Sequence, residues 1–313
     1  MTVAEGTFET QAAATERRAW TPTQMAWRRF RRHKMAMFGA CLLIGIILYV
    51  IGGAFFFSER DANYNDLSIK LSAPSREHPF GTDGTGRDVL ARTIYGGQIS
   101  IIIGLCAMVV SVTVGVLVGA IAGYYGGVID AILMRFTEAM FNIPQLFLLI
   151  VLAKFLSGKI PTFELLGRSF SGSVIVIIGV IGVTSWMYLA RIVRAQFLAL
   201  KEWEFVTAAR CVGVKDFSLI FRHILPNSIA PIVVAATLGV ASAILNEAYV
   251  SFLGLGVQAP TATWGNMLDQ AYHHLDTEPW MWFFPGMLIL LTVLSINFLG
   301  DGLRDALDPR AIV

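Results

Sequence analysis

Long apolar segments alternate with polar ones along this chain. The apolar segments cover roughly residues 35–57, 101–124, 132–156, 173–197, 232–253 and 281–300. A helix rises about 1.5 Å per residue, so each segment is long enough to cross about 30 Å of hydrocarbon. Backbone groups in lipid must find their hydrogen bonds within the segment, which favours helices. The pattern predicts an all-α membrane protein with six transmembrane helices.

The composition agrees with a membrane protein. Hydrophobic residues make up 55% of the chain and charged residues 15%, with a mean hydropathy of +0.64. A soluble domain has about a quarter of its residues charged. The first apolar segment begins only near Met35, after a polar tail, and is too long for the core of a cleaved signal peptide. The three cysteines have no metal-ligand spacing and are interpreted as small apolar side chains.

Lys and Arg residues are distributed unevenly among the connections. Seven lie in the N-terminal tail and six in or beside the connection after the fourth apolar segment, whereas the loop from about Gly254 to Pro279 has none. Cytoplasmic loops carry the excess of Lys and Arg, so both termini are expected in the cytoplasm. The predicted division is a basic cytoplasmic tail (1–34), a first transmembrane helix (35–57), an extracytoplasmic loop (58–100), a core with five transmembrane helices (101–300) and a cytoplasmic C-terminal tail (301–313).

The expected outer loop has two parts. Its Gly81–Asp88 stretch is dense in turn-forming residues, and the following Val89, Leu90, Ile94 and Tyr95 suit a short helix on the membrane surface. The glycine-rich stretch lacks the Gly-Lys-Ser/Thr ending of a phosphate-binding loop. A structural turn cluster is therefore the preferred interpretation.

Small and polar residues inside the spans predict how the helices pack. Three glycines at four-residue spacing, from Gly115 to Gly123, lie on one helix face and favour close approach of a neighbouring helix. Arg135 and Glu138 are spaced for an i, i+3 ion pair. Asn142 with Pro144 predicts a kink in the third span.

Glu247 is an ionisable residue about 15 positions, or some 22 Å, into the fifth apolar segment. An ionisable group at that depth is expected to face protein or water. Two interpretations remain open. Glu247 lines a translocation path together with Asn246, where its carboxylate meets the amino group of a peptide, or it pairs with a polar side chain of a neighbouring helix or subunit.

The polar connection after the fourth span contains two apolar stripes at helical spacing. Phe205, Ala208, Ala209 and Val212 form the first stripe, and Gly213 separates it from a second stripe made by Phe217, Ile220, Phe221 and Ile224. Gly213 is suited to a left-handed turn, and Asp216 is expected to cap the second helix. The apolar faces must be buried, either in a groove of a partner protein or in the inner leaflet of the membrane.

Four stretches of the chain resemble one family. They are Glu204–Asn227 with Thr207-Ala208-Ala209 and Gly213, His78–Asp83 with Gly86–Asp88, Ala122–Gly127 with Asp130, and Phe252–Gly256 with Pro260–Gly265. In this order, and over nearly the whole chain from about Trp27, they resemble permeases of bacterial ABC importers in the branch for peptides and nickel. The basic segment before the first span also resembles the C-type subunit of dipeptide and oligopeptide permeases.

The resemblance implies a type I ABC importer fold with a cytoplasmic coupling-helix loop at about 201–226. In such permeases this loop presses into a groove on a cytoplasmic ATPase. The residues implied to couple this chain to the ATPase are Phe205, Thr207, Ala208, Ala209, Gly213, Phe217, Ile220, Phe221, His223 and Pro226. Thr207 stands where the family signature has glutamate, and Glu204 lies one turn earlier, where it could partly substitute for that carboxylate.

The resemblance also implies the assembly and its location. The chain is expected in the cytoplasmic membrane as a heterodimer with a B-type permease, together with two ATPase domains and an extracytoplasmic binding protein. It has no Gly-x-x-x-x-Gly-Lys-Ser/Thr sequence, so we expect ATP and Mg on the partner ATPases, no cofactor on this chain and no enzymatic activity of its own. Nucleic acid is not an expected partner. The implied substrates are di- or oligopeptides, with nickel chelates and glutathione-like compounds as alternatives.

Two other classes of protein fit the sequence less well. An ion-coupled secondary transporter predicts inverted repeats and several buried ionisable residues, and neither pattern is evident. An intramembrane hydrolase needs a nucleophile with a base at membrane depth, and no span pairs Ser with His. His273 and His274 are adjacent in an outer loop, where contact with a metal-bearing substrate is conceivable but two adjacent histidines do not form a ligand set.

Overall fold

The computed structural model describes residues 21–165 and 168–308. Five helices in this part of the chain are long and apolar enough to cross a membrane: α2 (Lys34–Gly53), α4 (Val89–Tyr125), α7 (Ser173–Leu200), α11 (Ile229–Phe252) and α13 (Trp280–Leu307). The third predicted span is divided into α5 (Gly127–Phe141) and α6 (Gln145–Leu156), which together are apolar enough for one crossing but are bent by 85° at the break between them. Five of the six predicted spans are therefore confirmed as long apolar helices, and the sixth stays a prediction that treats the bent pair as one span.

Short elements occupy the two ends of the bundle. They are α1 (Pro22–Arg32), α3 (Glu59–Asn63), the 3-10 turn η1 (Leu67–Ile69), the strands β1 (Phe163–Leu165) and β2 (Arg168–Phe170), α8 (Glu204–Cys211), α9 (Asp216–Ser218), the π-helical turn η2 (Leu219–Ile224), α10 (Leu225–Asn227), α12 (Trp264–Ala271) and the 3-10 turn η3 (Tyr272–His274). The strands form an antiparallel hairpin that the sequence patterns did not predict. Arg168 holds this hairpin to Glu59 of α3 at 3.1 Å and to Gln98 of α4 at 2.7 Å.

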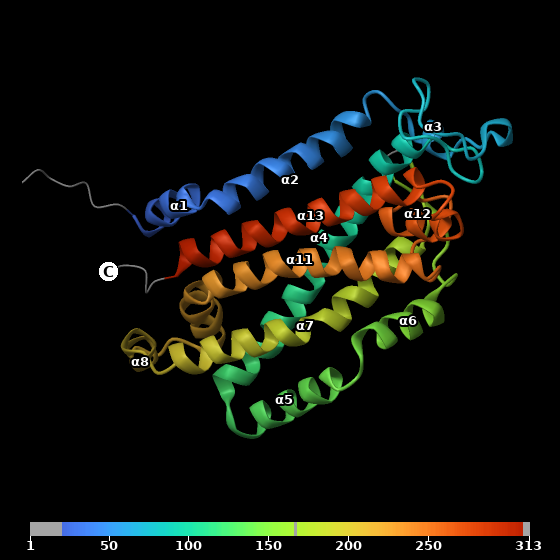
Figure 1. The fold of residues 1–313 in the computed structure, drawn as a ribbon. Coiled ribbons are helices and arrows are strands. Elements are labelled where there is room, and N and C mark those ends of the chain that lie inside the picture. Colours follow the sequence, from blue (N-terminus) through green and yellow to red (C-terminus); the bar gives the residue numbers. More distant parts are fainter. Residues whose placement is uncertain (1–20, 166–167, 309–313) are drawn as a thin grey trace, which may run out of the picture.

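The connections segregate to opposite ends of the bundle. α1, α8 and the C-terminal end of α13 lie together at one end, called the α8 end, whereas α3 and α12 lie at the other, called the α12 end (Figure 1). The N-terminal tail, the coupling loop and the C-terminal tail thus share one side, as the charge distribution predicts. Arg17, Arg18 and Arg310, which contribute to that charge asymmetry, lie outside the described residues.

Glycines bring α4 and α7 into direct backbone contact. A Cβ atom on Gly119 would lie 2.5 Å from the Ala190 carbonyl oxygen, and one on Gly123 would lie 2.6 Å from the Phe197 Cβ. A side chain at either position would separate the two helices. The predicted close packing along the Gly115–Gly123 face is confirmed.

The helix that follows the turn cluster is continuous with the second apolar segment. Asp88 caps α4 by accepting a hydrogen bond from the Ala91 N–H at 2.8 Å, and the helix then runs without a break to Tyr125. The short helix expected at 89–95 is not separate, because it forms the first turns of α4, where Val89 and Ile94 are buried against neighbouring elements. With 37 residues, α4 is longer than the roughly 20 residues that cross the hydrocarbon, so the outer boundary at residue 100 stays a prediction.

Predicted helix boundaries shift elsewhere in the chain. The first transmembrane helix ends at Gly53 instead of 57, and the last continues to Leu307 instead of 300. The N-terminal segment expected as a tail contains the helix α1. Each shift has the same cause, because helices continue or stop where tertiary contacts and caps satisfy the backbone and not only where hydropathy changes.

The break in the third span follows from Asn142 and Pro144. Pro144 has no N–H to continue the helix, and the Asn142 side chain donates to the Glu138 carbonyl at 2.9 Å, which satisfies a group at the end of α5. The predicted kink is confirmed as a full break. The predicted Arg135–Glu138 pair is confirmed at 3.3 Å, on an exposed helix face.

Candidate functional site

The loop after α7 folds into a pair of short helices around Gly213. The Gly213 φ of +80° is left-handed, and a Cβ added there would meet no atom within 4 Å beyond its chain neighbours. Its N–H donates to the Arg210 carbonyl at 3.0 Å, and the Val214 N–H donates to the Ala209 carbonyl at 3.1 Å. These two bonds form a Schellman motif, the ending for which glycine is best suited. The prediction of a glycine turn between two helices is confirmed.

One side of this helix pair packs against its own bundle. Val206, Ala209, Ile220 and Ile224 are buried in a cluster that includes Phe197 of α7. This corrects the prediction for Ala209 and Ile220, which were expected to contact a partner. The apolar spacing predicted a buried face correctly, but the second helix is wound partly as the π-helical turn η2, which rotates its residues relative to a simple α-helical stripe.

The opposite side presents aromatic and aliphatic side chains to the outside. We call this set the outer apolar face, and its members are Trp203 (57% exposed), Phe205 (36%), Val212 (80%), Phe217 (75%) and Phe221 (38%). The Phe217 and Phe221 rings lie 4.6 Å apart between centroids. Trp203 was not predicted, although a tryptophan at the start of a polar-loop helix was a usable signal. Thr207, Ala208 and Pro226 are also exposed, and His223 is half-buried.

A side-chain hydrogen bond holds the helix pair to the bundle. The Tyr124 hydroxyl at the end of α4 donates to the Asp216 carboxylate at 2.6 Å. This corrects the predicted cap, because the N-cap of the second helix is Lys215 and Asp216 makes no capping bond. The helix pair is therefore attached to the end of α4. Nearby, Arg194 of α7 binds both carboxylate oxygens of Asp130 in α5, at 2.5 and 2.6 Å, which joins these two helices to each other.

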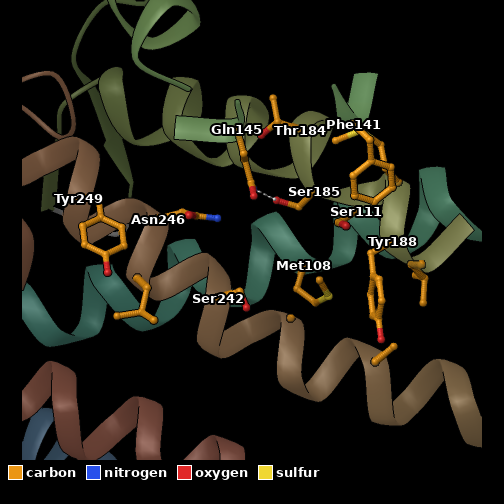
Figure 2. A pocket seen from close by; sticks show the side chains of 15 residues that line it. Met108, Ser111, Phe141, Gln145, Thr184, Ser185, Tyr188, Ser242, Asn246 and Tyr249 are labelled. Carbon is orange, nitrogen blue, oxygen red and sulfur yellow. Dashed lines mark hydrogen bonds between the residues drawn. The ribbon is translucent and has the colours of Figure 1, made fainter. Parts of the chain in front are cut away.

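A cavity of about 370 Å³ lies between α4, α7, α11 and the α5–α6 break (Figure 2). Its polar lining consists of Ser111, Gln145, Thr184, Ser185, Tyr188, Ser242, Asn246 and Tyr249. None of the described residues that line it is charged. A second cavity of about 510 Å³ toward the α8 end shares Tyr188 and Ala235 with the first. The two cavities follow one another along the bundle axis.

Asn246 and Glu247 are adjacent in sequence but lie in different environments. Asn246 is half-buried and lines the cavity, whereas Glu247 is fully buried and does not line it. The Glu247 carboxyl accepts hydrogen bonds from Ser251 at 2.7 Å and from Ser100 of α4 at 3.1 Å. No Lys, Arg or His of residues 21–165 and 168–308 forms an ion pair with it. In this conformation Glu247 has the polar-neighbour arrangement of the second interpretation.

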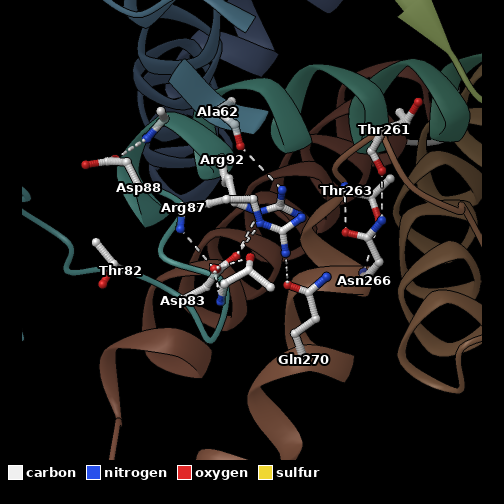
Figure 3. Close-up of polar contacts among 12 residues, drawn as sticks. Ala62, Thr82, Asp83, Arg87, Asp88, Arg92, Thr261, Thr263, Asn266 and Gln270 are labelled. Carbon is white, nitrogen blue, oxygen red and sulfur yellow. Dashed lines mark hydrogen bonds and ion pairs between the residues drawn. The ribbon is translucent and has the colours of Figure 1, made fainter. Parts of the chain in front are cut away.

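An ionic cluster organises the turn-rich Gly81–Asp88 stretch at the α12 end (Figure 3). Asp83 binds the Arg87 Nε at 2.8 Å and lies 3.6 Å from the Arg92 Nε, and Arg87 also donates to Gln270 of α12 at 2.8 Å. Burial by itself would raise the pKa of Asp83, but Arg87, Arg92 and the Thr85 hydrogen bond together hold that pKa below its ordinary value. The stretch is a structural turn cluster, as the sequence indicated.

No group of three or more His, Cys, Asp or Glu side chains that could hold a metal occurs in the described part of the chain. His274 instead contacts the Glu278 carboxylate at 2.7 Å, one helical turn away. The Thr277 hydrogen bond, together with His274, lowers the pKa of Glu278. The adjacent His273 packs its ring against Tyr272.

Comparisons with known proteins cover almost the whole chain. Residues 115–313 match the family described as "Binding-protein-dependent transport system inner membrane component", and residues 21–74 match the "N-terminal TM domain of oligopeptide transport permease C". A putative peptide permease protein of Brucella suis is 44% identical over 292 residues, which cover 93% of this chain and 92% of that protein.

Further relatives have similar lengths and identities. The dipeptide transport system permease protein DppC of Bacillus subtilis is 39% identical over 96% of this chain and 89% of its own length. The oligopeptide transport system permease protein OppC of Haemophilus influenzae is 40% identical over 92% of this chain and 88% of its own length. A solved structure titled "Crystal structure of an amino acid ABC transporter with histidines" is similar with a TM-score of 0.44 and 18% identity, over 66% of this chain and 94% of that chain. The chain therefore belongs to the family of inner membrane components of binding-protein-dependent transport systems, and it is similar over most of its length to the C-type permeases of dipeptide and oligopeptide systems.

Proposed function

We propose that this chain is one permease subunit of an ATP-driven importer that moves peptides across the cytoplasmic membrane. The importer contains a second, B-type permease, two cytoplasmic ATPase domains that bind ATP and Mg, and an extracytoplasmic binding protein. Relatives at 39–44% identity are named peptide, dipeptide and oligopeptide permeases, which supports a peptide substrate. In this proposal the α8 end, with both described ends of the chain, faces the cytoplasm.

The observation that carries the proposal is the two-sided helix pair around Gly213. Its inner side is buried in the bundle and held by the Tyr124–Asp216 hydrogen bond, while its outer apolar face has no cover within the described residues. An amphipathic helix with an exposed apolar face fits a groove on another protein. Movement of a protein that holds Phe217 and Phe221 would be transmitted through Asp216 to α4, and through α8 to α7.

The cavities supply the path for alternating access. The cavity near Asn246 opens between α4, α7 and α11, and the second cavity continues from Tyr188 toward the α8 end. A movement of α4 and α7 would change the widths of both cavities. We propose that ATP-driven closure of the ATPases moves the helix pair and so exposes the cavities to one side of the membrane at a time.

The coupling proposal is tested by placing charge on the outer apolar face. Phe217→Asp with Phe221→Asp should abolish co-purification of the ATPase and reduce peptide uptake to background, because two carboxylates cannot be buried in an apolar groove without a large desolvation penalty. The matched control is Tyr64→Asp with Leu67→Asp, which places the same charges on exposed side chains of the outer loop. Stoichiometric ATPase and normal uptake with the Phe217 and Phe221 variant would contradict the proposal.

The substrate is tested in cells that carry the complete importer. Uptake of labelled di- and oligopeptides should stop when ATP is depleted and persist when the ion gradients alone are collapsed. Mass spectrometry of compounds retained by the cognate binding protein identifies the natural ligand. Retention of nickel chelates or glutathione-like compounds without peptides would assign the importer to another substrate.

A further inference from the structure

We propose that the cavity in Figure 2 binds the transported peptide through hydrogen bonds to its backbone, with Ser111, Gln145 and Asn246 as the binding groups. The site accepts peptides regardless of the charge on their side chains. This inference rests on the proposed function as a peptide importer. It adds which side chains bind the peptide inside the bundle and which part of the peptide they contact.

Ser111 supplies the first argument. It is fully buried in α4, and its Oγ is one of two buried side-chain polar atoms in the described residues that have no hydrogen-bond partner, the other being the Arg92 Nε. Two other lining hydroxyls bond to their own helix, Thr184 to the Val180 carbonyl at 2.8 Å and Ser242 to the Leu238 carbonyl at 3.4 Å. A buried hydroxyl without a partner is unfavourable and calls for an explanation. Ser111 lies at the cavity wall, and because its Oγ is closed off in this conformation, we expect a ligand to reach it when the surrounding helices move apart.

The two amide side chains supply the second argument. Gln145 begins α6 and makes a long hydrogen bond of 3.4 Å to Ser185, and the Asn246 amide makes none within the described part of the chain. They come from different helices, and both line the same space (Figure 2). A carboxamide carries the same donor and acceptor groups as a peptide bond. Ser111, Gln145 and Asn246 therefore offer backbone-like partners to a peptide.

The absence of charge supplies the third argument. None of the described lining residues is ionisable as Asp, Glu, Lys, Arg or His, and the neighbouring Glu247 is turned toward Ser100 and Ser251. A fixed charge in the cavity would attract one class of peptide and repel another. The volume of about 370 Å³ is at the small end of the range for ligand pockets, about 300–1,000 Å³, which suits a short segment of extended peptide.

The first test removes the unpartnered hydroxyl. Ser111→Ala breaks no hydrogen bond within the described chain, so assembly and thermal stability should be unchanged. The KM for peptide uptake should rise by about two- to tenfold, the effect of losing one neutral hydrogen bond. Thr113→Val is the control, because Thr113 is exposed on another face of α4 and lies outside the lining. A Ser111→Ala variant with unchanged uptake kinetics would contradict a binding role for this hydroxyl.

The second test adds a charge to the cavity. Asn246→Asp should shift the ratio of uptake of Ala-Lys-Ala to Ala-Glu-Ala at least about tenfold toward the lysine peptide, because a carboxylate in a site of low effective dielectric discriminates by charge. Asn246→Leu should lower the uptake of both peptides equally. Asn65→Asp, on the exposed outer loop, should leave the ratio unchanged. The ratio compares two substrates in one variant, so expression differences cancel.

The outcomes separate this inference from the proposed function. If the unaltered importer shows no ATP-dependent peptide uptake, the proposed function fails. If it takes up peptides but Asn246→Asp leaves the charge ratio unchanged, the binding-site inference is overturned and the proposed function stands. Should Asn246→Asp fail to assemble, Gln145→Glu places the same charge on α6 and decides the question by the same ratio.

Discussion

Glu247 illustrates at the scale of one residue how an ionisable group can be structural. Its carboxyl accepts from Ser100 and Ser251, and these serines accept in turn from the backbone N–H groups of Trp264 and Val257, each at 3.2 Å. The carboxyl is thus the final acceptor of two chains of hydrogen bonds, one through Ser100 and one through Ser251. Through them α11 is connected to α4, to the start of α12 and to the loop before it.

Glu247→Gln should leave assembly and peptide uptake near the levels of the unaltered protein. Glutamine keeps one acceptor oxygen, and its NH₂ group can donate to a free lone pair of either serine, so the cost should be about 1 kcal/mol or less. Glu247→Leu removes both acceptors and should cost about 1–3 kcal/mol for each unpaired hydroxyl. Thermal unfolding and uptake are measured in parallel. A fully assembled Gln variant with strongly reduced uptake would instead support the interpretation in which the Glu247 carboxylate lines the translocation path.

Asp83 gives a pH dependence whose sign follows from its lowered pKa. The folded state holds that pKa below the ordinary value of about 3.9, so the stabilising contribution is complete above that value and is lost as pH falls through the lower folded pKa. Acid should therefore loosen the outer loop, as detected by limited proteolysis from the outside. Asp83→Asn leaves the buried Arg92 without its counter-charge and should cost about 3–5 kcal/mol at neutral pH. Equal protease resistance of both proteins at pH 7 would contradict this role.

At the scale of elements, the turn at Gly213 sets the angle between the two coupling helices. Gly213→Val should destabilise the turn by about 1–2 kcal/mol or more, because a β-branched residue is strained at a φ of +80°. Nothing lies within 4 Å of the added Cβ, so steric contact with a neighbour contributes no penalty. The expected result is a lower ratio of co-purified ATPase. Gly213→Asn is the matched control, since asparagine tolerates left-handed dihedrals, and an equal loss in both variants would show that φ is not the cause.

The packing of α4 on α7 gives a second prediction at this scale. Gly119→Ala should separate the two helices and lower the unfolding temperature, because its Cβ would lie 2.5 Å from the Ala190 carbonyl oxygen. Gly179→Ala, in α7, meets nothing within 4 Å and should be neutral or stabilising by up to about 1 kcal/mol, since alanine is the better helix former. Equal unfolding temperatures of the two variants would argue against the close contact.

At the scale of the whole molecule, the proposed orientation is open to cysteine labelling. Ser75 is exposed in the outer loop, and a cysteine there should react with an impermeant thiol reagent added outside intact cells. Cys41, Cys106 and Cys211 are all exposed and must first be replaced. A variant that retains only Cys211, in α8, should label only after the membrane is permeabilised. The reverse pattern would invert the topology.

Much of the fold could be predicted from sequence, but the contacts of single side chains could not. The apolar segments and the loop charges predicted six spans and the grouping of the termini with the coupling loop. Ala209 and Ile220 were expected on a partner-facing surface and are buried in this chain, because an apolar stripe indicates burial without naming its neighbour. One interpretation placed Glu247 beside Asn246 on a translocation path, but only Asn246 lines the cavity, whereas Glu247 is buried against Ser100 and Ser251.

The sequence by itself determined the features that depend only on the residues of one continuous segment. Transfer of about 20 apolar residues into hydrocarbon decides a span, and a glycine with its neighbours decides a turn at Gly213. Only the tertiary structure decided that residues 89–125 form one helix, that Asp216 binds Tyr124, and that Ser111 reaches a cavity wall without a partner. These features depend on which residues, distant in the chain, lie within about 3–4 Å of each other, and no periodicity along one segment contains that information.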